Sequence, residues 1–183
     1  SPAANLHVHT DSNGEGVLIK STGNTSNALT FDANRGTEGV IGVAYGRWNG
    51  TTVAQMSFIS GSDGTNKDDG VITFGTESAA SSGNVNATER MRIDSSGQVG
   101  IGVTPDTWST GAGITVGTSQ GTLWGAGDQI NLSGNAYFNS GWKAAASKAG
   151  ASQIEQALGN IDFKVSGSVT ADSAITFTNA MRI

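Results

Sequence analysis

Residues Met91–Pro105 read Met-Arg-Ile-Asp-Ser-Ser-Gly-Gln-Val-Gly-Ile-Gly-Val-Thr-Pro, and they predict a β-hairpin. At the start of the stretch, Met91 and Ile93 alternate with charged residues, which is the two-residue period of a β-strand. At its end, Val99 and Ile101 alternate with glycine in the same way. The Ser-Ser-Gly between the two strands has the composition of a turn.

Parts of this stretch recur elsewhere in the chain. Its first three residues return as Met181-Arg182-Ile183, and the Ser-Pro at positions 1 and 2 corresponds to its last two residues, Thr104-Pro105. The two recurrences have periods of 90 and 103 residues, so the copies share anchors but differ in loop length. The recurrence predicts two tandem β-rich modules of short strands and hairpins. They comprise residues 1–104 and residues 105–183, and the second module is expected to be truncated at its end.

The composition predicts an all-β fold. Glycine accounts for 27 of 183 residues, about twice its ordinary share of ~7%, whereas proline accounts for only 2. The apolar residues form short runs between small polar residues, as in short strands joined by turns. The strands expected are Leu6–His9, Val17–Ser21, Ala28–Ala33, Gly39–Arg47, Thr52–Ser60, Gly70–Glu77, Glu89–Asp94, Gln98–Gly102, Gly113–Val116, Thr122–Trp124, Gln129–Leu132, Asn135–Asn139, Asn160–Val165 and Ala174–Phe177.

The composition also limits the partners of the chain. There is no cysteine, and the abundant glycine leaves few side chains for a core, so burial of surface between subunits is expected. The net charge of −5 and the scattered basic residues argue against a nucleic-acid partner. No apolar run is long enough to cross a membrane, so membrane insertion is not expected.

Two segments allow alternative interpretations. Residues 143–158 are rich in alanine, which favours a helix. Gly150 interrupts them, which favours a hairpin of Trp142–Ala146 with Ser152–Gln156. In the hairpin of Met91–Pro105, Gly100 and Gly102 leave one strand face bare, which predicts close approach of another chain or a simple glycine-rich edge strand.

Metal binding and catalysis have few candidate residues. His7 and His9 share one face of a predicted strand, and a His-x-His pair could ligate a zinc or iron ion. The alternative is a solvated or packed histidine pair. Asp63, Asp68 and Asp69 lie in a loop that could carry paired carboxylates for glycoside hydrolysis, but its composition is typical of a long hairpin connection. We expect no cofactor.

Aromatic residues are the candidates for carbohydrate binding. Tyr45, Trp48, Tyr137 and Trp142 could stack on sugar rings, because each ring offers a large apolar face and Tyr and Trp add a polar group. Trp48 and Trp142 occur at similar places in the two copies, which favours the alternative that they fill module cores or seams between subunits.

Residues 89–105 closely resemble a repeat found in the tail fibres and tailspikes of bacteriophages, and residues 135–183 resemble modules of the same family. In this chain Gln98 stands where Asn is usual, and Val103-Thr104 is shorter than the usual linker. The resemblance implies a parallel homotrimeric β-rich fibre in the virion, in contact with other phage tail proteins. Such fibres often end in an endosialidase-type intramolecular chaperone, which would follow Ile183 because nothing in the chain resembles it.

These observations predict a structural segment of a phage tail fibre or tailspike that positions host-receptor binding, and not an enzyme. The first alternative is a carbohydrate-binding module that recognises host surface polysaccharide through loops such as Ser60–Gly70 and the tryptophan-bearing turns. The second alternative is a polysaccharide depolymerase.

Overall fold

The computed structural model describes residues 8, 17–79, 86–118 and 120–183. By its internal contacts the chain divides into two units, residues 1–32 and residues 33–183. The described residues contain strands and turns but no helix, so the all-β prediction is confirmed.

Residues 17–38 contain no strand, so the predicted strands at Val17–Ser21 and Ala28–Ala33 are wrong. Around Ser21 the backbone bends instead: the Ser21 hydroxyl accepts a hydrogen bond from the Gly23 amide and lies 2.7 Å from the Thr25 hydroxyl. A strand requires a neighbouring strand as well as alternating side chains, and such local bonds compete with strand pairing. The predicted strand Leu6–His9 lies outside the described residues, except for position 8.

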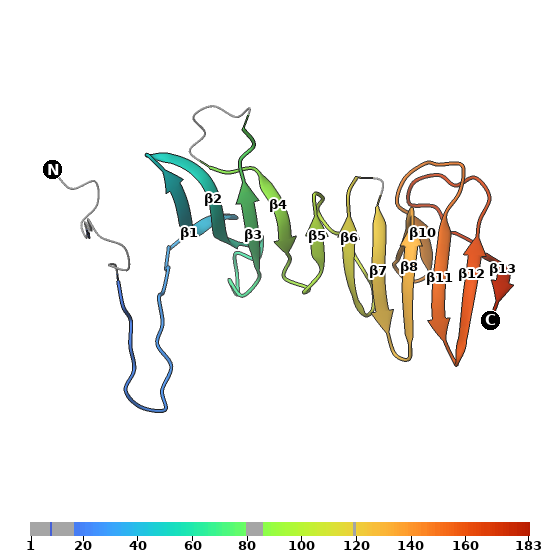
Figure 1. Cartoon of the computed structure of the whole chain (residues 1–183), viewed down its shortest axis with the longest axis horizontal. Helices are drawn as coiled ribbons and strands as arrows, with labels where there is room; N and C mark the ends of the chain where they lie inside the picture. The colour runs from blue at the N-terminus through green and yellow to red at the C-terminus, as the bar shows by residue number, and fades with distance from the viewer. Residues whose placement is uncertain (1–7, 9–16, 80–85, 119) are drawn as a thin grey trace. The chain divides into compact units, whose positions relative to one another are not determined.

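Residues 33–183 form one large sheet of eleven strands (Figure 1). Its strands follow the chain in sequence order, and every neighbouring pair is antiparallel except β5 and β6, which are parallel. The strands are β1 (Gly39–Trp48), β2 (Thr51–Ser60), β3 (Gly70–Thr76), β4 (Glu89–Ile93), β5 (Val99–Ile101), β6 (Ala112–Val116), β7 (Gly121–Ala126), β8 (Gln129–Gly134), β11 (Ser152–Ala157), β12 (Asn160–Val165) and β13 (Thr178–Arg182).

A second, small sheet consists of β9 (Ala136–Phe138) and β10 (Trp142–Ala144). The segment 143–158 is therefore not a helix, but the predicted hairpin within it is also wrong. Trp142–Ala144 forms an antiparallel pair with the preceding strand, β9, whereas Ser152–Ala157 joins the large sheet between β8 and β12. The strand predicted at Ala174–Phe177 begins later, at Thr178.

The hairpin predicted at residues 89–102 is confirmed as β4 and β5. Its turn is closed by Asp94, whose carbonyl accepts a hydrogen bond from the Gly97 amide and whose carboxylate accepts one from the Gln98 amide. Gly97 has a φ of +77°, a conformation that glycine adopts without steric cost. The expected turn chemistry therefore determines this hairpin.

The recurring Met-Arg-Ile segments occupy equivalent positions in the sheet. In β4, Met91 pairs with Phe74. In β13, Met181 pairs with Phe163. In both pairs the register shifts directly after the phenylalanine, so the repeated sequence carries a repeated β-bulge.

The bare face of Gly100 is covered by its own chain, so the prediction that another chain approaches there is wrong. A Cβ at Gly100 would lie 2.1 Å from the Val103 carbonyl oxygen and 2.8 Å from Pro105 Cδ. These residues belong to the connection that crosses the sheet from β5 to the parallel β6. Gly102 has a φ of +69°, a backbone conformation that favours glycine, and a Cβ there would meet no other atom of this chain within 4 Å.

The core lies between the large sheet and the second layer that includes β9 and β10. An alanine-rich cluster of Ala136, Ala144, Ala151 and Ile175 adjoins a cluster of Trp108, Trp124 and Tyr137. Trp142 packs against both clusters. Trp124 stacks on Phe138 with ring centroids 4.8 Å apart, so aromatic side chains supply the burial that glycine cannot.

Candidate functional site

The large sheet has one polar face and one apolar face. Across β7 and β8, Thr122 pairs with Ser133, and Leu123 pairs with Leu132 on the opposite face. Thr122 and Ser133 are buried, whereas Leu123 and Leu132 are 41% and 57% exposed. This is the reverse of an ordinary single-sheet domain, which turns its apolar face to the core and its polar face to water.

The apolar face continues along the sheet. Strand register carries it from Phe74 in β3 through Met91 in β4 and Ile101 in β5 to Val116 in β6. Exposed apolar surfaces shared by several strands are typical of interaction sites on proteins. Its exposed side chains are Ile72, Phe74, Ile101, Val116, Leu123, Ile130, Leu132, Ile154, Ile161, Val165 and Met181.

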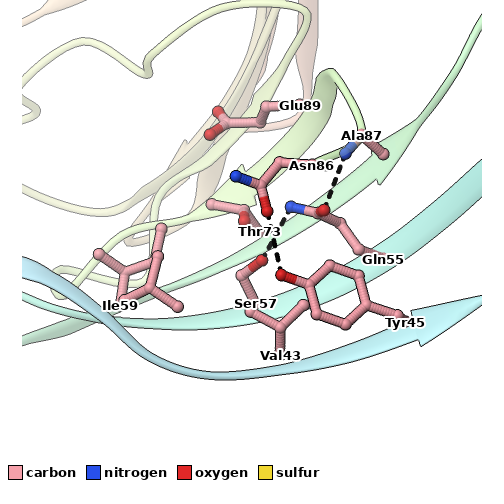
Figure 2. A pocket seen from close by; sticks show the side chains of 10 residues that line it. Val43, Tyr45, Gln55, Ser57, Ile59, Thr73, Asn86, Ala87 and Glu89 are labelled. Carbon is pink, nitrogen blue, oxygen red and sulfur yellow. Dashed lines mark hydrogen bonds between the residues drawn. The ribbon is translucent and has the colours of Figure 1, made fainter. Parts of the chain in front are cut away.

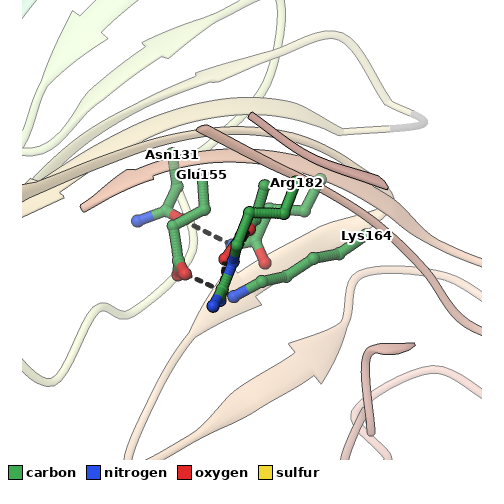
Figure 3. A network of polar contacts seen from close by, with 6 residues as sticks. Asn131, Glu155, Lys164 and Arg182 are labelled. Atoms are coloured by element: carbon green, nitrogen blue, oxygen red, sulfur yellow. Dashed lines mark hydrogen bonds and ion pairs between the residues drawn. The ribbon is translucent and has the colours of Figure 1, made fainter. Parts of the chain in front are cut away.

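The polar face is cross-linked near the end of the sheet (Figure 3). Arg182 donates two hydrogen bonds to Asp162, at 2.6 and 2.7 Å, and these lower the pKa of Asp162 and raise that of Arg182. Because each pair joins two different strands, the network holds the strands in register. The pairs are Gln153 with Asn131, Lys164 with Glu155, and Arg182 with Asp162.

A pocket of about 410 Å³ opens on the polar face of β1, β2 and β3 (Figure 2). It lies within the range of about 300–1,000 Å³ that is usual for small-molecule sites. Tyr45, a predicted carbohydrate-binding residue, forms part of its wall. The lining residues are Val40, Val43, Tyr45, Gln55, Ser57, Ile59, Thr73, Asn86, Ala87 and Glu89.

Hydrogen bonds fix the polar side chains of this pocket (Figure 2). The Tyr45 hydroxyl donates to Asn86 Oδ1 at 3.0 Å. Gln55 accepts a hydrogen bond from the Ala87 amide at 2.8 Å and donates one to Ser57 Oγ at 3.0 Å. The segment before β4 is thereby tied to β1 and β2, and the pocket wall has a defined shape.

The four predicted carbohydrate-binding aromatics are not brought together. Tyr45 and Trp48 lie on β1 and are 41% and 79% exposed, while Tyr137 and Trp142 lie on β9 and β10. Tyr137 is buried, and Trp142 meets Trp124 edge to face with ring centroids 5.5 Å apart. Tyr137 and Trp142 thus contribute to the core, and Tyr45 and Trp48 remain accessible to a ligand.

Two carboxyl groups lie near the buried Tyr137. Its hydroxyl donates to Asp172 Oδ1 at 2.7 Å, and burial, followed by this hydrogen bond, raises the pKa of Tyr137 to about 12. Burial, and then the charge of Asp172, raises the pKa of Asp106 to about 6. Asp106 is therefore a titrating group of the crossover connection, but the pair is too small a donor set for a metal centre.

The acidic loop after β2 is a hairpin connection, as expected. The Asp69 carboxylate accepts a hydrogen bond from the Asp63 amide, and Asp63 in turn accepts bonds from the amides of Thr65 and Asn66. The amides of Asn66 and Thr65 lower the pKa of Asp63. Within the described part of the chain, no cluster of His, Asp or Glu could hold a metal ion. His7 and His9 lie outside that part.

The sequence analysis missed most of the pocket. It placed Gln55 and Ser57 in a strand, where alternation with Met56 was the available signal that they share a face. Asn86 and Ala87 carried no signal, because they reach the pocket only through the return of the chain from β3 to β4. Alternation in each strand predicted that the sheet has an apolar face, but it did not predict that this face is exposed.

No protein-family model matches this chain, and neither a curated protein nor a solved structure is significantly similar to it. In the portion of the chain that the structure describes, no helix is long and apolar enough to cross a membrane.

Proposed function

We propose that this chain is a structural segment of a phage tail fibre or tailspike, part of the virion, in which three copies associate in parallel and position host-receptor binding. The observation that carries the proposal is the exposed apolar face of the large sheet. The sequence resemblance supplies the class of assembly and the stoichiometry. The proposal assigns no enzymatic reaction to the chain.

In the proposed assembly, the apolar faces of three copies meet along a common axis. Burial of apolar surface contributes about 25 cal/mol per Å², and this would offset the small core of the single chain. The strands follow one another in sequence order, so the sheet lengthens by about 4.8 Å with each strand. Such a rod needs no disulfides, and it could join other tail proteins at its ends.

The first test is sedimentation equilibrium of the purified chain, whose mass is 18.5 kDa. We expect a stable species of three times that mass at micromolar concentration. A monomer would contradict the assembly. A dimer, formed by two sheets packed face to face, would contradict the three-fold arrangement.

A second candidate function, recognition of host surface polysaccharide, is favoured by the exposure of Tyr45 and Trp48 on one strand. Exposed aromatic rings are typical stacking surfaces for sugars. The test is retention of the chain on immobilised host polysaccharide, with Trp48→Ala and Tyr45→Ala compared with the parent. Loss of retention in either variant would support this function, and absence of retention in the parent would contradict it.

A further inference from the structure

We propose that the pocket bounded by β1, β2 and residues 86–89 is a binding site for one neutral pyranose unit of a glycan, an inference that rests on the second candidate function. The pocket combines two kinds of lining (Figure 2). Val40, Val43 and Ile59 are apolar, whereas Tyr45, Asn86 and Glu89 contribute polar groups. Ser57 and Thr73 also belong to the lining but are buried. A pyranose has the matching mixture of apolar C–H faces and hydroxyl edges.

The polar groups are already oriented for such a ligand. Ser57 is only 2% exposed, and its Oγ accepts a hydrogen bond from Gln55, so it fixes the orientation of the Gln55 amide in the pocket wall. Asn86 accepts a hydrogen bond from the Tyr45 hydroxyl at Oδ1, and this bond orients its side-chain NH2 group, which is a donor. Because these side chains are already oriented before binding, ordering them on binding would cost little conformational entropy.

The charges in the pocket favour a neutral ligand. Glu89 is the one carboxylate among the lining residues, and it is paired with Arg92 at 2.6 Å. A carboxylate compensated in this way can accept hydrogen bonds from sugar hydroxyls, and the ion pair adds no net charge that would select an ionic ligand. The guanidinium of Arg47 lies over the Tyr45 ring, 4.7 Å from its centroid.

The pocket lies on the face of the sheet opposite to the apolar face. Val43 pairs with Ser57 on the pocket side, whereas Ala44 pairs with Met56 on the other side. Association through the apolar faces would therefore leave one open pocket on each copy. A glycan with several equivalent sugar units would then bind with avidity, without any new contact.

The experiment is saturation-transfer NMR with the methyl glycosides of glucose, galactose, mannose and N-acetylglucosamine as separate probes. We expect millimolar binding of at least one probe to the parent chain. Tyr45→Ala and Ser57→Val should each weaken that binding at least fivefold, and circular dichroism should show that both variants keep their strands. Leu158→Asn is the control, because Leu158 is an exposed residue of the turn between β11 and β12, outside the pocket. It should bind like the parent.

The proposal is overturned if no probe binds, or if Tyr45→Ala and Ser57→Val both bind like the parent. The measurement is repeated on Leu132→Lys, which alters the apolar face. Unchanged binding per chain would support the pocket even if the assembly proposal fails, whereas loss of binding with an intact fold would contradict it. A parent chain that forms trimers but binds no sugar would contradict the proposed sugar site and leave the proposed assembly standing.

Discussion

Gly100 shows how one residue permits the crossover between β5 and β6. Its missing side chain leaves room for the Val103 carbonyl and for Pro105, which pass directly over the strand. Gly113 has the same role beside Trp108, since a Cβ there would lie 2.8 Å from Trp108 Cε2. The glycines of the repeated motif are thus packing residues as well as turn residues.

Gly100→Ala is expected to lower the free energy of unfolding by about 3 kcal/mol, the upper range for overpacking, because the obstructing atoms are backbone. Urea denaturation followed by tryptophan fluorescence measures the change. Gly167→Ala is the control, since a Cβ there meets no atom within 4 Å. Equal effects of the two substitutions would show that the crossover does not lie over Gly100.

Asp106 makes stability depend on pH. Its pKa is raised in the folded protein from 3.8 to about 6, so folding favours the protonated carboxyl. This stabilising contribution is complete below pH 3.8 and is lost as the pH rises to about 6 and beyond. Asp106→Asn should therefore stabilise the protein above pH 6, by about 1 kcal/mol after allowance for solvent screening.

Calorimetric melting temperatures at pH 4 and pH 7.5 test this effect. The Asn variant should melt higher than the parent at pH 7.5 and close to it at pH 4. Asp128→Asn, at an exposed turn position between β7 and β8, provides the comparison. A gain of equal size at both pH values would argue against titration of Asp106.

At the scale of the element, turns set the register of the hairpins. The β1–β2 turn uses Asn49-Gly50, with φ values of +48° and +86°, which is the preferred sequence for a two-residue hairpin turn. The β11–β12 turn adopts the same signs, +51° and +78°, but with Leu158-Gly159. Leu158 is also 82% exposed, so the leucine adopts an unfavourable left-handed backbone conformation without burying its side chain.

Leu158→Asn is expected to raise the free energy of unfolding by about 0.5–1 kcal/mol, because Asn tolerates the left-handed conformation. The midpoint of urea denaturation measures the gain. The reverse change, Asn49→Leu in the β1–β2 turn, should lower stability by a similar amount. If Leu158→Asn destabilises the protein, the leucine makes contacts that the single chain does not contain.

At the scale of the whole molecule, the distribution of apolar side chains between the two faces of the sheet limits the stability of a single copy. The polar face is partly covered by the second layer and by its own side-chain network, while the apolar face is open. A single copy therefore leaves much of its available hydrophobic stabilisation unused.

If copies associate through this face, the melting temperature should rise with protein concentration, because association favours the folded state by mass action. Leu132→Lys and Val116→Lys place a charge on exposed positions of the face and should remove both the concentration dependence and the oligomer. Leu158→Asn, at a turn, should preserve both. Calorimetry at several concentrations and sedimentation measure these effects, and an unchanged oligomer in both lysine variants would contradict the role of this face.

Local patterns predicted much of the sheet. Alternation was sufficient for Glu89–Ile93 and Asn160–Val165, since strand side chains alternate whatever lies next to them. It failed at Val17–Ser21, which alternates poorly and has no strand beside it in the structure. For the candidate site, the sequence identified Tyr45. It could not identify Asn86, because Asn86 lines the pocket only through the way in which the chain folds back before β4.

The sequence by itself determined the all-β class, the Met91–Ile101 hairpin and the recurrence of Met-Arg-Ile, because each depends on residues close together in the chain. Only the tertiary structure decided that Trp142–Ala144 turns back to β9 while Ser152–Ala157 joins β8. It also decided which face of the sheet is covered and that Gly100 lies under its own crossover. These features depend on which distant segments pair and pack with one another, and a local sequence pattern does not contain that information.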